Sequence, residues 1–369
     1  MFAQGEHIVR LFEGWVPPHL AVKDDRIGLQ VGTLRKEVKK VMLALDVTPE
    51  VAEEAVRQHV DLIIAHHAVI FQPLKTLRTD TQKGRLYEKL IKHDVAVYIA
   101  HTNWDIAPGG VNDVLAEKLD LRERRVLAPI HSQVLKKLVV FVPEEQHEQV
   151  LNALGEAGAG WIGNYSHCTF NQPGTGTFKP TEGANPFIGE EGKLERVKEI
   201  RIETVLTEDN EQRVIDAMLS AHPYEEVAYD IYPLDLKGQT FGLGRIGRLE
   251  KSTSLESFAE KVKEAYGIPA LRVVGNPKRT IRRVALMGGM GSKFLANAVR
   301  ERADVYITAD IDFHTAHDAI GDGIALIDPG HHIEHLVLQP MQARLADALA
   351  KTDTAVVLSK IDTNPFRYM

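Results

Sequence analysis

Short apolar runs alternate with amphipathic segments through the first third of the chain. The apolar runs have the length of single strands and are typical of strands buried on both faces, whereas the segments between them repeat apolar residues at helical spacing. The predicted strands are 39–48, 61–67 and 95–102, and the predicted helices are 49–60, 83–94 and 109–119. Because each strand is followed by a helix of this length, we expect a parallel sheet with helices packed on its faces.

The pattern changes between residues 129 and 237, where two strand–helix–strand units follow each other. This order is the ferredoxin-like βαββαβ arrangement. The strands are predicted at 135–143, 164–172, 197–207 and 225–234, the helices at 144–158 and 209–222, and a long Gly/Pro-rich loop at 172–192. A segment of about 100 residues is long enough to fold as a module of its own.

The alternation of strands and helices returns from residue 238. The predicted helices are 255–267, 292–303, 313–323 and 341–352, and the predicted strands are 282–289, 304–310, 324–330 and 354–360. We interpret residues 1–128 and 238–369 as one discontinuous α/β domain, with a sheet flanked by helices, interrupted by an inserted α+β module at 129–237. Three consecutive domains are the alternative. Insertion is favoured because the candidate chemistry draws on both ends of the chain.

Histidines and carboxylates follow three of the predicted strands. His66 and His67 end one strand, His101 and Asp105 follow the next, and the strand at 324–330 leads to a further group around residues 331–334. In open α/β sheets, ligands bind outside the carboxyl ends of the strands. Imidazole and carboxylate together suit zinc, iron, manganese or cobalt. We therefore expect these strand ends to form a metal site.

The spacing of these residues favours two ions over one. Adjacent residues of a strand point to opposite sides, so His66 and His67 would not readily chelate the same ion. A carboxylate that bridges two neighbouring ions resolves this geometry. Glu334 lies three residues after His331 and shares its face if a helix begins there, whereas His332 points elsewhere. The alternative is a set of hydrogen-bonded or solvated histidines, which the repetition at three strand ends disfavours.

Two further features carry weaker predictions. The segment MGGMGSKF follows a strand, and the backbone N–H groups around Gly288, Gly289, Gly291 and Ser292 are candidates for holding an anion such as a phosphate. A tight turn with close packing explains the same glycines. His101 and His314 are candidates for proton transfer, with a plain surface position as the alternative for His314.

Net charge, apolar runs and cysteine content limit the partners and the cellular compartment that we expect. The chain of 369 residues has a formal charge of −7, so no basic surplus is available to neutralise nucleic-acid phosphates. No apolar run approaches the roughly 20 residues of a membrane helix, and the start of the chain has no pattern of a secretory signal. The single cysteine, Cys168, excludes an intramolecular disulfide. We expect a cytoplasmic protein that is not a membrane protein and has little affinity for nucleic acid.

Five segments together resemble a known family. AHHAVIF, AHTNWD, GGMGSKF, ITADIDFHTAHDA and IDPGHHIEH are similar, in this order, to the motifs of the Nif-three-like proteins, many of which are labelled GTP cyclohydrolase I type 2 homologues. The segment AHPYEEVAYDIYPL resembles the PII-like or CutA-like insert of the longer bacterial members. The family's Asp-Asn-x-Gly motif has Arg26 in place of the asparagine in this chain.

The resemblance implies a centre of two divalent ions, zinc or iron, in each subunit of a toroidal homohexamer. The implied ligands are His66, His67, Asp105, His331 and Glu334, with Glu334 or Asp105 as the bridge. The implied function is a metal-dependent hydrolase that acts on GTP or a related small molecule, with water attacking C8 of guanine and formate leaving. A non-catalytic, metal-binding regulatory or scaffold hexamer is the alternative, and the acidic balance disfavours a DNA- or transcription-factor-binding role.

Overall fold

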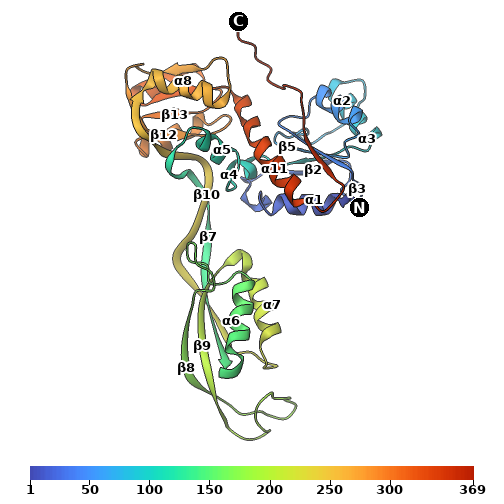
Figure 1. Cartoon of the computed structure of the whole chain (residues 1–369), viewed down its shortest axis with the longest axis vertical. Helices are drawn as coiled ribbons and strands as arrows, with labels where there is room; N and C mark the ends of the chain where they lie inside the picture. Colours follow the sequence, from blue (N-terminus) through green and yellow to red (C-terminus); the bar gives the residue numbers. More distant parts are fainter. The chain divides into compact units, whose positions relative to one another are not determined.

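The computed structural model describes residues 1–369 and divides the chain into two compact units (Figure 1). The larger unit combines Met1–His131 with Phe241–Met369, and the smaller unit is Ser132–Thr240. Two long strands, β7 (Arg122–Pro143) and β10 (Tyr229–Ser254), carry the chain from the larger unit to the smaller one and back. The predicted limits of the insert, 129 and 237, fall inside these strands, where no turn or loop marks a boundary.

One sheet of the larger unit joins the two ends of the chain. Its strands lie in the order β15 (Ala355–Leu358), β4 (Lys40–Ala44), β5 (Leu62–Ala65), β6 (Ala96–Ile99) and β2 (Gly28–Val31). The first four strands are parallel and β2 is antiparallel to β6. Every residue of β5 and β6 is buried, as their unbroken apolar sequences predict. The fold class predicted from the sequence, helices flanking a mostly parallel sheet, is confirmed.

The larger unit contains a second sheet where the sequence predicted a single one. In this sheet β10 is followed by β12 (Thr280–Leu286), β13 (Val305–Ile307), β14 (Ala325–Asp328) and β11 (Arg272–Val274). Strands β12, β13 and β14 are parallel, and antiparallel β10 and β11 flank them. The returning strand β10 pairs with β12, so these strands belong to the eight-stranded sheet that β10 shares with β7 and two strands of the smaller unit, and only β15 rejoins the first sheet. Periodicity predicts strands but does not predict which of them pair.

Several helices of the larger unit begin and end at residues that commonly cap helices. Thr48 caps α2, whose first residue is proline, and Gly267 ends α8 in the left-handed conformation. The helices are α1 (Gly5–Glu13), α2 (Pro49–Arg57), α3 (Gln82–Lys92), α4 (Thr102–Ile106), α5 (Val111–Lys118), α8 (Leu255–Tyr266), α9 (Leu295–Arg300), α10 (Phe313–Gly321) and α11 (Leu338–Ala348). The remaining elements are β1 (Ala3–Gln4), β3 (Glu37–Val38), and the 3-10 helices η1 (Pro18–Leu20), η4 (Ser292–Phe294) and η5 (His331–Val337).

The smaller unit has the predicted ferredoxin-like order. Its further elements are η2 (Glu144–Gln146), α6 (His147–Glu156), β8 (Thr169–Phe178), β9 (Glu195–Thr207), η3 (Glu208–Asn210) and α7 (Glu211–Ala221). The strands lie in the order β10, β7, β9, β8, and β9 is antiparallel to both of its neighbours. Apolar residues of α6 and α7 pack against those of β7 and β9 in a separate core. The opposite face of the sheet has no helix.

The first strand after α6 differs from the prediction. It begins at Thr169, not at residue 164, and continues to Phe178, through part of the predicted loop at 172–192. β8 is the edge strand of the sheet and pairs with β9 along its whole length. Because an edge strand has a free side, it tolerates Pro173 and the glycines that follow, which in an isolated sequence indicate a loop.

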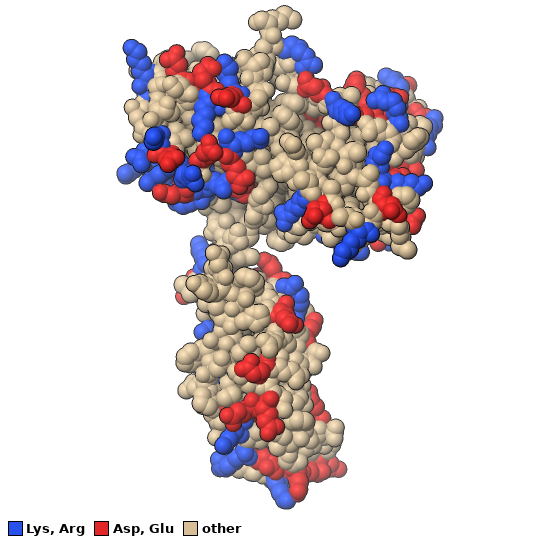
Figure 2. Space-filling model, in the orientation of Figure 1, with Lys and Arg blue, Asp and Glu red and all other residues tan.

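Two further features of the structure bear on its surroundings: the length of its helices and the charge of its surface. No helix combines the length and the apolar composition that crossing a membrane requires. On the face drawn in Figure 2, basic and acidic side chains are interspersed, without a continuous basic area. This distribution agrees with the small acidic excess of the sequence.

Phe12 is a test of the larger unit's core. Its ring is fully buried and packs edge-on against Trp104 with 5.2 Å between ring centroids. We expect Phe12→Ala to lower the free energy of unfolding by about 3–5 kcal/mol, because it removes this contact and leaves a cavity. Urea denaturation measures the change, with exposed Phe71→Ala as the control that should have little effect. Equal stability of the two variants would contradict this packing.

Candidate metal centre

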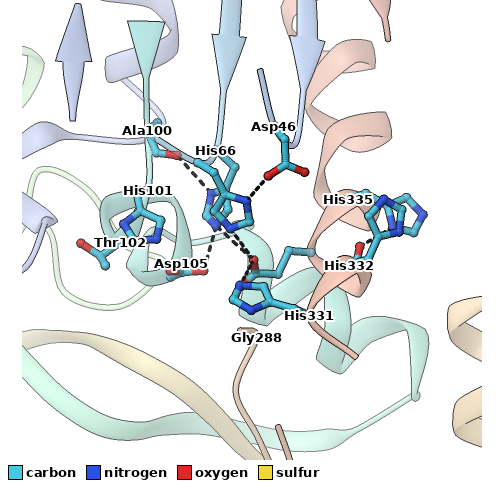
Figure 3. A network of polar contacts seen from close by, with 12 residues as sticks. Asp46, His66, Ala100, His101, Thr102, Asp105, Gly288, His331, His332 and His335 are labelled. Carbon is cyan, nitrogen blue, oxygen red and sulfur yellow. Dashed lines mark hydrogen bonds and ion pairs between the residues drawn. The ribbon is translucent and has the colours of Figure 1, made fainter. Parts of the chain in front are cut away.

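Six side chains from distant parts of the sequence meet in the larger unit (Figure 3). β5 leads directly into two of them, β6 and α4 supply two more, and η5 supplies the last two. We call these residues the His/carboxylate cluster: His66, His67, His101, Asp105, His331 and Glu334. The structure thus brings together all five predicted ligands and His101, although they follow strands of two different sheets and not one edge of a single sheet.

Glu334 lies at the centre of the cluster. Its Oε2 atom is 3.1 Å from Nε2 of His67, 3.2 Å from Nε2 of His331 and 3.6 Å from Nε2 of His66. The 3-10 conformation of η5 explains one of these contacts, because residues three apart are eclipsed in such a helix, and His331 and Glu334 therefore lie on the same side. A carboxylate surrounded in this way is suited to bridge two cations.

The donor atoms form overlapping groups of three. One group is His67, His331 and Glu334, and another is His66, Asp105 and Glu334, each with its ligand atoms within 4.8 Å of one another. These two groups share only Glu334. A third group, His66, His67 and His101, has the same spacing and places His101 within reach of the others.

Two atoms of the cluster are buried without a hydrogen-bond partner. They are Nε2 of His66 and Oδ1 of Asp105, which are 3.8 Å apart and thus too far for a hydrogen bond. Two ligands of one tetrahedral zinc ion lie about 3.3–3.5 Å apart, given bonds of about 2.0–2.1 Å. Because leaving such groups unpaired is costly, a cation between them is the arrangement that these residues fit.

The four imidazoles share one orientation. In each, Nδ1 contacts an acceptor, namely the carbonyl oxygen of Ala100 for His66, Asp46 for His67, Asp25 for His101 and Asp310 for His331. These contacts are 2.6–3.1 Å long. An Nδ1–H that donates to such an acceptor leaves the lone pair of Nε2 free for a metal. This arrangement is typical of histidine ligands.

The pKa values of the cluster indicate which of its groups carry protons in the metal-free protein. Burial, followed by the charge of Glu334, raises the pKa of Asp105 well above its usual range. Burial lowers the pKa of His66 to about 3, so this imidazole is neutral. Burial also opposes the charge on His67, but hydrogen bonds to Asp46 and Glu334 raise the pKa of His67 to about 10. A hydrogen bond to Glu334 raises the pKa of His331 to about 9. Protons on His67 and His331 therefore compensate the buried charge of Glu334, and the raised pKa of Asp105 favours its neutral form.

The glycine segment after β12 packs directly against the cluster. A Cβ atom at Gly289, whose φ is +60°, would be 2.7 Å from Oε1 of Glu334, and one at Gly288 would be 3.1 Å from the same atom. The N–H groups of Gly288 and Gly291 already donate to Asn112 and Thr308. Close approach to Glu334 thus accounts for Gly288 and Gly289, in agreement with the tight-packing interpretation.

Asn112 connects this segment to the other side of the cluster. Its side-chain oxygen accepts from the N–H of Gly288, and its amide nitrogen donates to the carbonyl oxygen of Asp105, both at 2.9 Å.

Ser292, also predicted as an anion ligand, begins only a short 3-10 helix and has a buried hydroxyl without a partner.

Two other predicted or considered histidines lie outside the cluster. His314 is exposed on α10, so the structure does not bring this proton-transfer candidate to the other residues. His332 stacks on His335 at 4.6 Å, to one side of the cluster in Figure 3, and its Nε2 is 3.6 Å from Asp362. The sequence made His332 a weaker ligand candidate than its neighbour His331, and the structure places it outside the donor groups.

Sequence reasoning missed the carboxylates that hold the imidazoles. Asp46 follows β4 and Asp310 follows β13, so both occupy the same kind of strand end that indicated the histidines. The rule that ligands follow strand ends would therefore have identified both aspartates. Asp25 lies in a loop before β2 and contacts His101 and Thr102. It is the aspartate of the motif in which Arg26 replaces the asparagine, so the resemblance marked its position without indicating this role.

The raised pKa values predict how the stability of the metal-free protein depends on pH. Because the pKa of His331 is raised from 6.5 to about 9, its charge stabilises the folded state fully below pH 6.5, and this contribution is lost as the pH rises through 9. With a chelator present, we expect the difference in Tm between the unmodified protein and His331→Gln to shrink between pH 6.5 and pH 10.

Thermal unfolding followed by circular dichroism measures this difference. His332→Gln is the matched control, because burial lowers the pKa of His332 and this residue stays neutral throughout the same range. Its Tm difference should remain constant. A constant difference for His331→Gln would show that His331 carries no stabilising charge.

Curated relatives match the chain over its whole length. Residues 3–365 match the family described as Duf34/NIF3 (NGG1p interacting factor 3). A Halalkalibacterium halodurans protein named GTP cyclohydrolase 1 type 2 homolog is 52% identical over 369 residues, which cover 100% of this chain and 99% of that protein. A Bacillus subtilis protein of the same name is 50% identical over 367 residues, which cover 99% and 98%.

Solved structures agree with these matches. The crystal structure of a Bacillus cereus protein related to NIF3 has a TM-score of 0.95 at 49% identity, covering 100% of both chains. A Staphylococcus aureus protein has a TM-score of 0.78 at 30% identity, covering 100% of this chain and 99% of that one. The resemblance that the sequence motifs indicated is confirmed: this chain belongs to the Duf34/NIF3 family.

Proposed function

We propose that the His/carboxylate cluster binds two divalent metal ions and that the protein is a metal-dependent hydrolase. The observation that carries this proposal is the pair of donor groups that share Glu334, together with the unpartnered atoms of His66 and Asp105. One ion would be held by His67, His331 and Glu334, and the other by His66, Asp105 and Glu334. This set of nitrogen and oxygen donors suits zinc or iron, with manganese and cobalt also compatible.

Two such ions supply an acidified water and polarise the substrate group that it attacks. The chain's own residues supply positioning and proton transfer. Asp25 accepts from Nδ1 of His101 at 2.8 Å and also from the backbone N–H of Thr102, so its carboxylate fixes the imidazole ring. Nε2 of His101 is then free to take a proton from a reacting group or to return one.

The name of the relatives supplies the first substrate to test. Proteins at 52% and 50% identity are called GTP cyclohydrolase 1 type 2 homolog. We therefore propose a nucleotide or related small molecule as substrate and GTP as the first compound. In that reaction one water adds at C8 of guanine and opens the ring to a formamide, and a second water hydrolyses the formamide to an amine and formate, so formate is a direct readout.

The metal content of variants tests the two-ion centre. We expect two ions in each unmodified chain, one in Asp105→Asn and one in His331→Gln, because each substitution removes a ligand from only one of the two groups. Glu334→Gln should lose both ions, since it removes the shared charge. Elemental analysis by mass spectrometry on anaerobically purified protein gives these numbers.

His332→Gln is the matched control for this series. His332 neighbours His331 in the sequence but lies outside the cluster, so this variant should keep both ions. Two ions retained in Glu334→Gln, or loss of metal from His332→Gln, would contradict the assignment of the ligands.

Substitution of His101 tests the proton-transfer role. We expect His101→Gln to lower kcat for formate release from GTP by about 100-fold or more, while the metal content stays the same. Proton NMR of formate and elemental analysis on the same samples measure both quantities. If the metal content falls with the rate, His101 is a ligand and not the proton carrier.

A non-catalytic regulator is the second candidate function. The observation that favours it is the smaller unit, which has its own core and contributes no residue to the cluster. The assay above separates the two. A protein loaded with two ions that leaves GTP and a panel of phosphoesters unchanged is a metal-binding regulator, and release of formate excludes that role as its only one.

A further inference from the structure

The smaller unit contains a large cavity that the metal chemistry does not use. Its volume is about 690 Å³, within the range of about 300–1,000 Å³ typical of small-molecule sites. Strands β8 and β9 line it together with residues 179–188 and the turn at 224–228. A hydrogen bond of 2.9 Å from the N–H of Asn185 to Glu225 joins these last two segments. We call this cavity the β8–β9 cleft.

Aromatic rings form much of the wall of the cleft. The lining includes Phe141, Phe178, Phe187 and Tyr224. The ring of Tyr224 lies 5.9 Å from that of Phe178 and 6.4 Å from that of Phe187, both measured between centroids. Phe187 is 54% exposed, so much of its ring is accessible to a ligand. Rings arranged in this way offer their faces to a flat or apolar ligand.

A buried carboxylate lies among these rings. Glu199 on β9 lines the cleft and is only 8% exposed. One of its oxygens accepts from the hydroxyl of Tyr224 at 3.0 Å, and no hydrogen-bond donor within the protein contacts the other, Oε2. Oε2 is not closed off from solvent, so it can accept from a donor outside the protein.

Two glycines of β8 make room for the carboxylate and for a ligand. A Cβ atom at Gly176 would be 2.1 Å from Oε2 of Glu199, so only glycine lets this side chain take its place. Gly174 pairs with Glu199 in the sheet, and a Cβ atom there would meet nothing within 4 Å. The space above Gly174 is therefore open.

The charges around the cleft favour a positive ligand. Three carboxylates line it, those of Glu199, Glu225 and Glu226, against the cations of Lys179 and Arg201. Arg201 is already paired with Glu203 at 2.9 Å, outside the cleft. A carboxylate combined with aromatic faces is the chemistry that recognises ammonium and guanidinium groups, through a charge-assisted hydrogen bond and cation–π contact.

We propose that the β8–β9 cleft binds a small organic cation, an amine or guanidine carried on an apolar or aromatic body. The cationic nitrogen donates to Glu199, and the body packs against the rings of Tyr224, Phe178 and Phe187. This site is separate from the proposed metal centre, because no residue of the His/carboxylate cluster lines it.

Phenethylamine and its neutral isostere 2-phenylethanol test the proposal. Isothermal titration calorimetry on the full chain should show saturable binding of the amine and at least about tenfold weaker binding of the alcohol, since the alcohol lacks the charge. Glu199→Gln should weaken binding of the amine by about tenfold or more for the same reason. Glu208→Gln, an exposed carboxylate outside the cleft, is the matched control and should bind as the unmodified protein does.

Gly174→Val keeps the test independent of any folding defect in Glu199→Gln. Its side chain would enter open space in the cleft beside Glu199 without backbone strain, so we expect it to weaken binding of phenethylamine while the Tm is retained. Equal affinity for amine and alcohol, unchanged binding by Gly174→Val, or no binding of phenethylamine at millimolar concentration would overturn the proposal. Binding of GTP in the cleft in preference to the amine would overturn it as well.

Discussion

The burial of two carboxylates beside each other is the constraint on which the site depends. Glu334 is 2% exposed and Asp105 is 7% exposed, and both belong to one group of donors. Two negative charges so close together and so far from water are strongly unfavourable unless positive charge compensates them. In the metal-free chain the compensation comes from protons, and two divalent ions would supply it more completely. Proton release on metal binding follows directly, because the ligands must lose their protons.

The carboxylates that orient the imidazoles increase the negative charge to be compensated. Asp46, Asp310 and Asp25 each orient one histidine, and each adds negative charge around the cluster. Asp46 is itself held by Thr363, whose hydroxyl donates to its second oxygen at 2.5 Å. The carboxyl-terminal segment thus supports the amino-terminal histidines. Such outer contacts fix the direction of the ligands before any ion arrives.

Much of this architecture was predictable because its signals are local. Apolar runs and amphipathic spacing indicated β4, β5, β6 and the helices between them, and His66 and Asp105 were recognisable by their place after strands. Pairing was not predictable, because it depends on contacts between distant residues. The second sheet, the extension of β8 through Pro173, and the contact of Asp25 with His101 all belong to this class. The glycines at 288 and 289 suggested an anion, although a Cβ atom at either position would crowd the Glu334 carboxylate.

The pairing of β15 with β4 determines when the centre can assemble. Ala355 is the partner of Lys40, so a strand near one end of the chain completes a sheet whose other strands are made early in synthesis. Contacts between residues so far apart in sequence form late and slowly. The nascent chain therefore carries His66, His67 and Asp105 for most of its translation without the residues of η5. The proposed ligand set is complete only once residues 331–334 have been made, so a shorter nascent chain lacks two of its members.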